Sequence, residues 1–106
     1  MGLFDLFTPS SGSVPKGAPS PNEPHALVLY KYDTCPYCRR VLRAIEQLEL
    51  DVEMADIHRD RANRDALIQK TGRSTVPCLF IDGQPLFESL DIIAWLTAYK
   101  EAGAKA

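Results

Sequence analysis

Two cysteines separated by two residues are the part of this sequence whose residue types and spacing could do chemistry. Cys35 and Cys38 lie in the stretch YKYDTCPYCRRV, residues 30–41. Such a pair can bind a metal ion, form a structural disulfide or act as a redox dithiol. A zinc site needs two more Cys or His ligands at suitable spacing, and the remaining candidates are scattered singly: Cys78, His25 and His58. We therefore expect no metal site.

The residues around the pair predict a strand before it and a helix after it. ALVLYKY, residues 26–32, is an apolar run of strand length. Residues 36–48 carry apolar side chains at helical spacing, with Pro36 in the first turn, where a missing N–H costs nothing. A thiol at a helix N-terminus is favoured as thiolate by the unpaired N–H groups and the helix dipole. We expect Cys35 to be the nucleophile and Cys38, one turn later, to resolve a mixed disulfide on it.

The rest of the chain continues the alternation of strands and helices. LDVEMADI, residues 50–57, alternates as a strand does, and RDRANRDALIQKTG predicts a helix that ends at Gly72. VPCLFI and LFE, joined by the turn DGQP, predict a hairpin, and a closing helix ends near Gly103. We expect an α/β fold of order βαβαββα, with a four-stranded mixed sheet flanked by three helices. Strands joined through helices should be parallel and the last two antiparallel.

Composition predicts one small domain behind a flexible tail. The chain has 106 residues, 45% of them hydrophobic, a net charge of −2 and three cysteines. Residues 1–24 are rich in Pro, Ser and Gly, so we expect a flexible tail there and the folded domain at 25–106. The opening MGLFDLF is either a loose terminus or a docking peptide for a partner or membrane surface.

The same composition bears on partners and location. The charge gives no sign of a nucleic-acid partner, and no apolar run approaches the roughly 20 residues needed to span a bilayer. The N-terminus lacks the basic start and apolar middle of a secretory signal. We expect a cytoplasmic protein, in which an odd number of cysteines argues for reactive thiols rather than a disulfide framework.

CPYC after a first strand, followed by GRSTVP, a hairpin and a short closing helix, resembles the dithiol glutaredoxins over roughly residues 26–101. The resemblance implies a thioredoxin-like fold and glutathione as co-substrate. It also implies that Pro77 is cis and that the backbone of Val76 pairs with bound glutathione as an added strand would. Tyr37 is implied to stack beside the bound thiol. Apart from the resemblance, we expect Cys78, on the strand after Pro77, to be either inert and buried or a secondary oxidation site.

The C-terminal part, VPCLFIDGQPLFESLDI, resembles the glutathione-binding half of the N-terminal domain of glutathione transferases. In that family a Glu-Ser pair holds the γ-glutamyl end, and it corresponds to Glu88 and Ser89. The alternative is that Ser89 only caps the helix and Glu88 favours its dipole. Many glutaredoxins place a Lys three residues before the first cysteine to meet the glycyl carboxylate, but that position is Tyr32 here. Arg73 is our candidate for that carboxylate.

These features predict a monomeric, glutathione-dependent thiol-disulfide oxidoreductase acting on glutathionylated or disulfide-containing proteins. Cys35 attacks the substrate, and glutathione or Cys38 resolves the mixed disulfide. The alternative function is a carrier of an iron-sulfur cluster held through Cys35 and glutathione. Pro36 counts against the carrier, because the cluster-binding relatives usually have a smaller, more flexible residue there.

Overall fold

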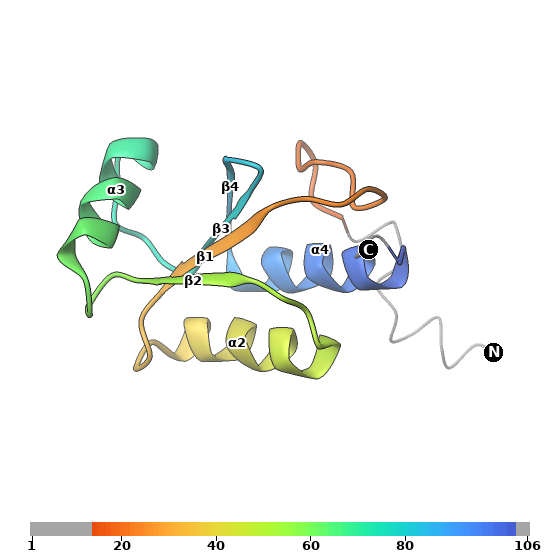
Figure 1. Ribbon diagram of the computed structural model, residues 1–106, viewed down its shortest axis with the longest axis horizontal. Coiled ribbons are helices and arrows are strands. Elements are labelled where there is room, and N and C mark those ends of the chain that lie inside the picture. The colour runs from red at the N-terminus through yellow and green to blue at the C-terminus, as the bar shows by residue number, and fades with distance from the viewer. Residues whose placement is uncertain (1–13, 104–106) are drawn as a thin grey trace.

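The computed structural model describes residues 14–103, and Figure 1 labels their helices and strands. The seven elements follow the predicted order βαβαββα, which is confirmed. Helix α2 begins at the predicted Pro36, and both ends of strand β1 lie within one residue of the prediction. The elements are β1 (Leu27–Lys31), α2 (Pro36–Leu48), β2 (Glu53–Asp56), α3 (Arg61–Thr71), β3 (Cys78–Ile81), β4 (Gln84–Phe87) and α4 (Ser89–Glu101).

The four strands form one mixed sheet of order β2-β1-β3-β4. β1 is parallel to β2, and β3 is antiparallel to both β1 and β4. The expectation that strands joined through helices run parallel is therefore right for β1 and β2 but wrong for β3. Helix α3 lies beyond one end of the sheet and does not carry the chain back along β2 (Figure 1). β3 consequently starts at the end where β2 finishes and runs the opposite way.

Helices cover the two faces of the sheet unequally. α2 and α4 pack against each other on one face, over a core that includes Leu29, Leu79 and Trp95. A smaller core on the other face contains Tyr30 and Leu67, the latter from α3. Successive strand residues point to opposite faces, so Leu29 and its neighbour Tyr30 enter different cores. The arrangement fixes the N-termini of α2 and α4, which carry the candidate site.

Residues 14–25, which we call the arm, lie against the domain. Val14 and Ala18 pack on the larger core, and the indole N–H of Trp95 donates to the carbonyl oxygen of Pro19 at 2.7 Å. We expected a flexible tail through residue 24, and these contacts differ from that expectation over residues 14–24. Composition predicted that the segment could not build a core of its own, but not that α4 would bind it. The opening MGLFDLF and its docking hypothesis lie outside the described residues.

The hairpin turn between β3 and β4 is built by Asp82 and Gly83. Both have positive φ, 50° and 90°, as a two-residue turn that matches the twist of the strands requires. Within residues 14–103, no helix combines the length and apolar character needed to cross a bilayer.

Candidate active site

The candidate site begins at the N-terminus of α2, where Cys35 is the N-cap residue. Its backbone is extended, at φ −79° and ψ 121°, and its Sγ accepts a hydrogen bond from the backbone N–H of Cys38 at 3.4 Å. Pro36 follows as the first helical residue, and the carbonyl of Cys35 accepts from the N–H of Arg39 at 2.9 Å. The helix start therefore points an N–H group at the sulfur, as the sequence predicted, and this N–H can stabilise a negative charge there.

The second thiol lies deeper than the first. Cys35 is 5% exposed and Cys38 is fully buried, and both are free thiols. Burial raises the pKa of Cys38 well above its ordinary value of 9.0, and this outweighs the opposing effect of a hydrogen bond to the backbone of Tyr32. Cys38 is thus held as a neutral thiol at physiological pH.

A cleft of about 590 Å³ opens beside this helix start. Three segments that are distant in the sequence form its walls: the first turns of α2, the loop before β3 and the first turn of α4. Its lining residues are Tyr37, Arg40, Thr75, Val76, Pro77, Glu88, Ser89, Leu90 and Asp91. The cleft therefore brings together five of the residues that the sequence predicted for glutathione.

The wall made by α4 has the features of a binding site for a carboxylate. Glu88 is the N-cap residue, and no side chain of the described residues caps this helix. The first backbone bond of the helix runs from the N–H of Ile92 to the carbonyl of Glu88, at 2.9 Å. The N–H groups of the first turn before Ile92 are free of intrahelical bonds and can receive an anion. Ser89, which is buried, adds a hydroxyl at the same place.

Glu88 also has an unusual backbone conformation. Its φ of 76° and ψ of 112° lie in a region that residues other than glycine seldom adopt. Such conformations persist where the surroundings impose them, and they are found at functional sites. Here the conformation joins β4 to α4 and places Glu88 and Ser89 on the wall of the cleft.

The loop before β3 forms another wall. The peptide bond between Val76 and Pro77 is cis, which confirms the prediction for Pro77. The pairing of β3 with its neighbours begins only at Cys78. The backbone of Val76 thus lies on the cleft outside the sheet ladder.

Sequence reasoning placed Arg73 less well and missed several lining residues. Arg73 does not line the cleft, and its guanidinium lies 4.1 Å from the centroid of the Phe87 ring. Thr75 and Asp91 were not predicted, although Thr75 belongs to the TVP segment and Asp91 follows Ser89 in the first turn of α4. Arg40 and Leu90 also line the cleft and were not predicted. The TVP and ES motifs were the signals that could have identified Thr75 and Asp91.

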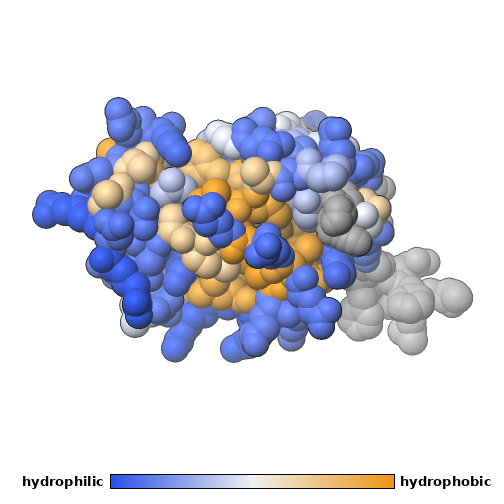
Figure 2. Space-filling model, viewed as in Figure 1, coloured by the Kyte–Doolittle hydropathy of each residue, from blue (hydrophilic) through white to orange (hydrophobic). Residues whose placement is uncertain are grey.

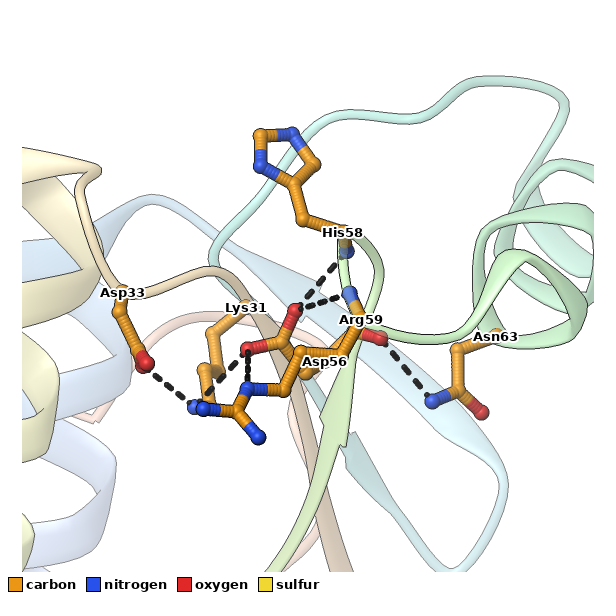
Figure 3. Close-up of polar contacts among 6 residues, drawn as sticks. All are labelled: Lys31, Asp33, Asp56, His58, Arg59 and Asn63. Carbon is orange, nitrogen blue, oxygen red and sulfur yellow. Dashed lines mark hydrogen bonds and ion pairs between the residues drawn. The ribbon is translucent and has the colours of Figure 1, made fainter.

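Lys31 does not replace the lysine that many glutaredoxins place near the first cysteine. Figure 3 shows its ammonium paired with Asp33 and Asp56. The two distances are 2.7 Å and 3.3 Å, and the side chain is only 12% exposed. Asp56 also accepts the backbone N–H groups of His58 and Arg59, at 2.8 and 2.9 Å. Burial opposes ionisation, but these N–H groups and Lys31 together lower the pKa of Asp56. The cluster fixes the turn between β2 and α3.

Tyr32 takes the position of that lysine and lies next to the nucleophile. Its carbonyl accepts the N–H of Cys35 at 3.3 Å. Its ring stacks on the imidazole of His58, with centroids 3.9 Å apart and an interplanar angle of 14°. Figure 3 shows this imidazole pointing away from the carboxylate of Asp56.

Cys78 is the third cysteine and lies on β3, directly after Pro77. It is fully buried, and burial raises its pKa to about 12. Across residues 14–103, no three His, Cys, Asp or Glu side chains are grouped so that they could hold a metal ion.

Known proteins share this fold and this segment order. The N-terminal domain family of glutathione S-transferases matches residues 29–102. Glutaredoxin-C8 of Oryza sativa subsp. japonica is 33% identical over 98 residues, which cover 86% of this chain and 72% of that protein. A structure of a buckwheat glutaredoxin-glutathione complex is 27% identical, with a TM-score of 0.60 over 77% of this chain and 83% of that one.

Transferase structures match over a smaller part of their length. An epsilon-class glutathione S-transferase from the housefly, Musca domestica, is 30% identical, with a TM-score of 0.57 over 66% of this chain. The matched region is only 33% of that transferase, so this chain spans about a third of its length. The two glutaredoxins above match over most of both chains. The sequence identity to glutaredoxins and the shared fold, a mixed sheet with three helices, show that the chain belongs to the glutaredoxin family of glutathione-dependent disulfide oxidoreductases.

Proposed function

We propose that this chain reduces glutathione-mixed disulfides and protein disulfides through Cys35 and Cys38, with glutathione bound in the cleft. The observation that carries the proposal is the convergence of three walls at the start of α2, the helix that Cys35 caps. The start of α2, the Val76–Pro77 loop and the start of α4 all line the cleft. Tyr37, two residues after Cys35, is one of the lining residues.

The two thiols are suited to different steps. The Sγ of Cys35 accepts an N–H at the start of α2, and this N–H can donate to the nucleophilic sulfur during attack. Cys38 is fully buried and its raised pKa keeps it protonated. Cys35 therefore attacks first, and Cys38 can act only on a disulfide already formed at Cys35.

With a glutathione-mixed disulfide, the reaction needs only the first thiol. The thiolate of Cys35 attacks the glutathione sulfur, the substrate disulfide breaks, and the leaving protein thiolate takes up a proton. A second glutathione, as thiolate, then attacks the glutathione sulfur bound to Cys35. Oxidised glutathione leaves and the Cys35 thiolate is restored.

With a protein disulfide, Cys38 completes the reaction. Cys35 forms a mixed disulfide with one substrate sulfur, and the other substrate sulfur leaves and is protonated. Cys38 then loses its proton and attacks the Sγ of Cys35, and the departing substrate thiolate takes up a proton. The resulting Cys35–Cys38 disulfide is reduced by two molecules of glutathione, which become oxidised glutathione.

The cleft offers complementary groups for the two ends of the γ-glutamyl part of glutathione. Its carboxylate binds the hydroxyl of Ser89 and the free N–H groups of the first turn of α4. Its ammonium pairs with Glu88 or Asp91, both of which line the cleft. The backbone of Val76 pairs with the peptide backbone of glutathione, and Tyr37 lies beside its thiol. Arg73 is the residue we propose for the glycyl carboxylate, and it would have to leave the ring of Phe87 to reach it.

The glutathione site is tested by replacing Ser89 with alanine and measuring the dependence of rate on glutathione concentration. A hydrogen bond to a charged group contributes roughly 1.5–3 kcal/mol, so we expect the KM for glutathione to rise about tenfold or more. Thr97→Ala is the matched control. It removes a hydroxyl from the same helix, where Thr97 donates to the carbonyl of Ile93. A Ser89→Ala variant that keeps the wild-type KM would contradict the proposed role of Ser89 in binding glutathione.

A further inference from the structure

The arm, residues 14–25, is bound to α4 and to the β3–β4 turn by several independent contacts. Besides the bond from Trp95 to Pro19, the side-chain amide of Gln84 donates to the carbonyl of Gly17 at 2.7 Å. The N–H of His25, at the end of the arm, donates to the hydroxyl of Tyr99 at 3.0 Å. These contacts lie on α4 and on the β3–β4 hairpin, whereas α4 contributes only its first turn to the cleft.

The imidazole of His25 joins the arm to the turn. Its Nδ1 lies 2.5 Å from Oδ2 of Asp82, and its Nε2 lies 2.7 Å from the carbonyl oxygen of Ser20. Its side chain is only 7% exposed. The rings of Trp95 and Tyr99 surround it, with centroids 5.7 and 6.0 Å away. Both ring nitrogens are therefore engaged at once in a nearly enclosed place.

Both oxygens that face this ring can only accept hydrogen bonds. A carboxylate and a backbone carbonyl have no proton to give, and a neutral imidazole has a single N–H. In the neutral form, one ring nitrogen has no proton, so its lone pair would face the lone pairs of an oxygen and repel them. Only the imidazolium, which has two N–H groups, can donate to Asp82 and Ser20 together.

The charges around His25 favour the same protonation state. Asp82 faces it from the turn, Glu23 from the arm itself, and α4 contributes the uncharged rings of Trp95 and Tyr99. Burial of the ring lowers the pKa of His25, but the bonds to Asp82 and Ser20 and the two acidic charges outweigh it. The pKa consequently lies above its ordinary value of 6.5.

We propose that His25 is a proton-dependent latch, which fastens the arm to the β3–β4 turn as an imidazolium and releases it as a neutral imidazole. On deprotonation, either the bond to Asp82 or the bond to Ser20 is lost, because one N–H cannot serve both. The latch concerns how the arm is held and does not depend on the function proposed above.

The pH window follows from the directions of the two shifts. The contribution of His25 is fully present below its ordinary pKa of 6.5 and is lost as the pH rises through the raised value in the fold. The pKa of Asp82 is lowered by the N–H of Ala26 and by His25, so its contribution is lost only as the pH falls below its ordinary 3.8. The arm should be held most firmly between these limits.

The test uses the full-length protein and the indole N–H of Trp95, the only tryptophan in the chain. We would record its 15N–1H resonance and the ring nitrogen resonances of the histidines from about pH 5 to about pH 9. We expect the His25 nitrogens to show an imidazolium with a midpoint above 6.5, and the indole N–H resonance of Trp95 to shift through the same transition as its bond to Pro19 is lost. Both changes should occur while the other amide resonances of the domain stay in place.

Two variants and one control make the test specific. Asp82→Asn removes the charge but suits the positive φ at this position, so it should keep the turn and move the midpoint downwards. His25→Gln should abolish the transition of the indole. His58→Gln, the control at the other histidine, should leave it unchanged. If His25→Gln does not fold, Asp82→Asn still decides the matter.

The latch would be overturned if the titration midpoint of His25 in the wild type were at or below 6.5. An indole resonance of Trp95 that does not change with pH would overturn it as well. An unchanged midpoint in Asp82→Asn would do so as well, because the carboxylate would then not be the partner of the imidazolium. Turnover with glutathione should be the same in Asp82→Asn and in the wild type, since Asp82 does not line the cleft.

Discussion

The three cysteines are all buried, yet their positions give them different chemistry. Cys35 is the N-cap of a helix and receives an N–H, whereas Cys38 and Cys78 are enclosed without any exposed surface. The sequence predicted the position of Cys35 at the helix start, because Pro36 and the apolar spacing after it define that start. It left open whether Cys78 is inert, since burial of a side chain depends on strands and helices far away in the chain.

This difference predicts which thiol a small alkylating agent modifies. At about pH 7, iodoacetamide should label Cys35 alone, because the reactive form is the thiolate and burial raises the pKa of Cys78 to about 12. Intact-mass spectrometry with peptide mapping would identify the labelled residue. In denaturant all three cysteines should be labelled. Labelling of Cys78 in the folded protein, at a rate close to that of Cys35, would contradict the assignment.

At the same scale, the motifs predicted the site residues whose position depends on where the backbone turns. They did not predict where a long side chain points. Val76, Pro77, Glu88 and Ser89 line the cleft as expected, because TVP and ES fix where the chain turns. Arg73 instead lies over the ring of Phe87. A long, flexible side chain in a loop can take many directions, so its position in the sequence alone does not tell where its charge lies.

At the scale of elements, the direction of β3 shows that the order of helices and strands does not determine strand direction. The order βαβαββα was correct, and so was the hairpin. The parallel direction expected for β3 was wrong, because α3 lies beyond one end of the sheet (Figure 1). Whether a helix returns along the sheet depends on its packing, which its own sequence does not reveal.

The arm is the element whose contacts its composition did not predict. Its Pro, Ser and Gly residues cannot form a core, but their carbonyl groups can accept hydrogen bonds. The donors come from elsewhere: the indole of Trp95 and the amide of Gln84. The part of the arm that is apolar, Val14 and Ala18, packs on the larger core. Such an attachment cannot be predicted without knowing what α4 exposes.

The attachment predicts that the arm contributes to stability. A chain that starts at residue 25 should have a free energy of unfolding about 1–3 kcal/mol lower than one that starts at residue 14, because polar groups lose their partners and apolar contacts are lost. Urea unfolding of the two chains measures the difference. Equal midpoints and slopes would mean that the contacts are energetically neutral and that the domain begins at residue 25, as the sequence suggested.

At the scale of the whole molecule, one sheet with α2 and α4 on one face and α3 at its end makes a single small domain. Figure 2 shows apolar residues gathered in the middle of one face, with hydrophilic residues around them. Hydrophobic patches of this kind are found on monomers as well as at interfaces.

We predict that the protein is a monomer in solution. The cores on both sides of the sheet are formed within one chain, and no buried side-chain nitrogen or oxygen atom among residues 14–103 lacks a hydrogen-bond partner. Sedimentation equilibrium should give the chain mass of 11.8 kDa. A mass twice that value, independent of the redox state of the thiols, would contradict the prediction.

The most direct test of the central claim compares two cysteine variants on two substrates, with turnover coupled to glutathione reductase. Cys35→Ser should lose about a thousandfold or more of the activity on both substrates, because the nucleophile is gone. Cys38→Ser should keep most of the activity on a glutathionylated peptide but lose it on a protein disulfide. A Cys38→Ser variant that fails equally on both substrates, or a Cys35→Ser variant that stays active, would contradict the division of roles between the two thiols.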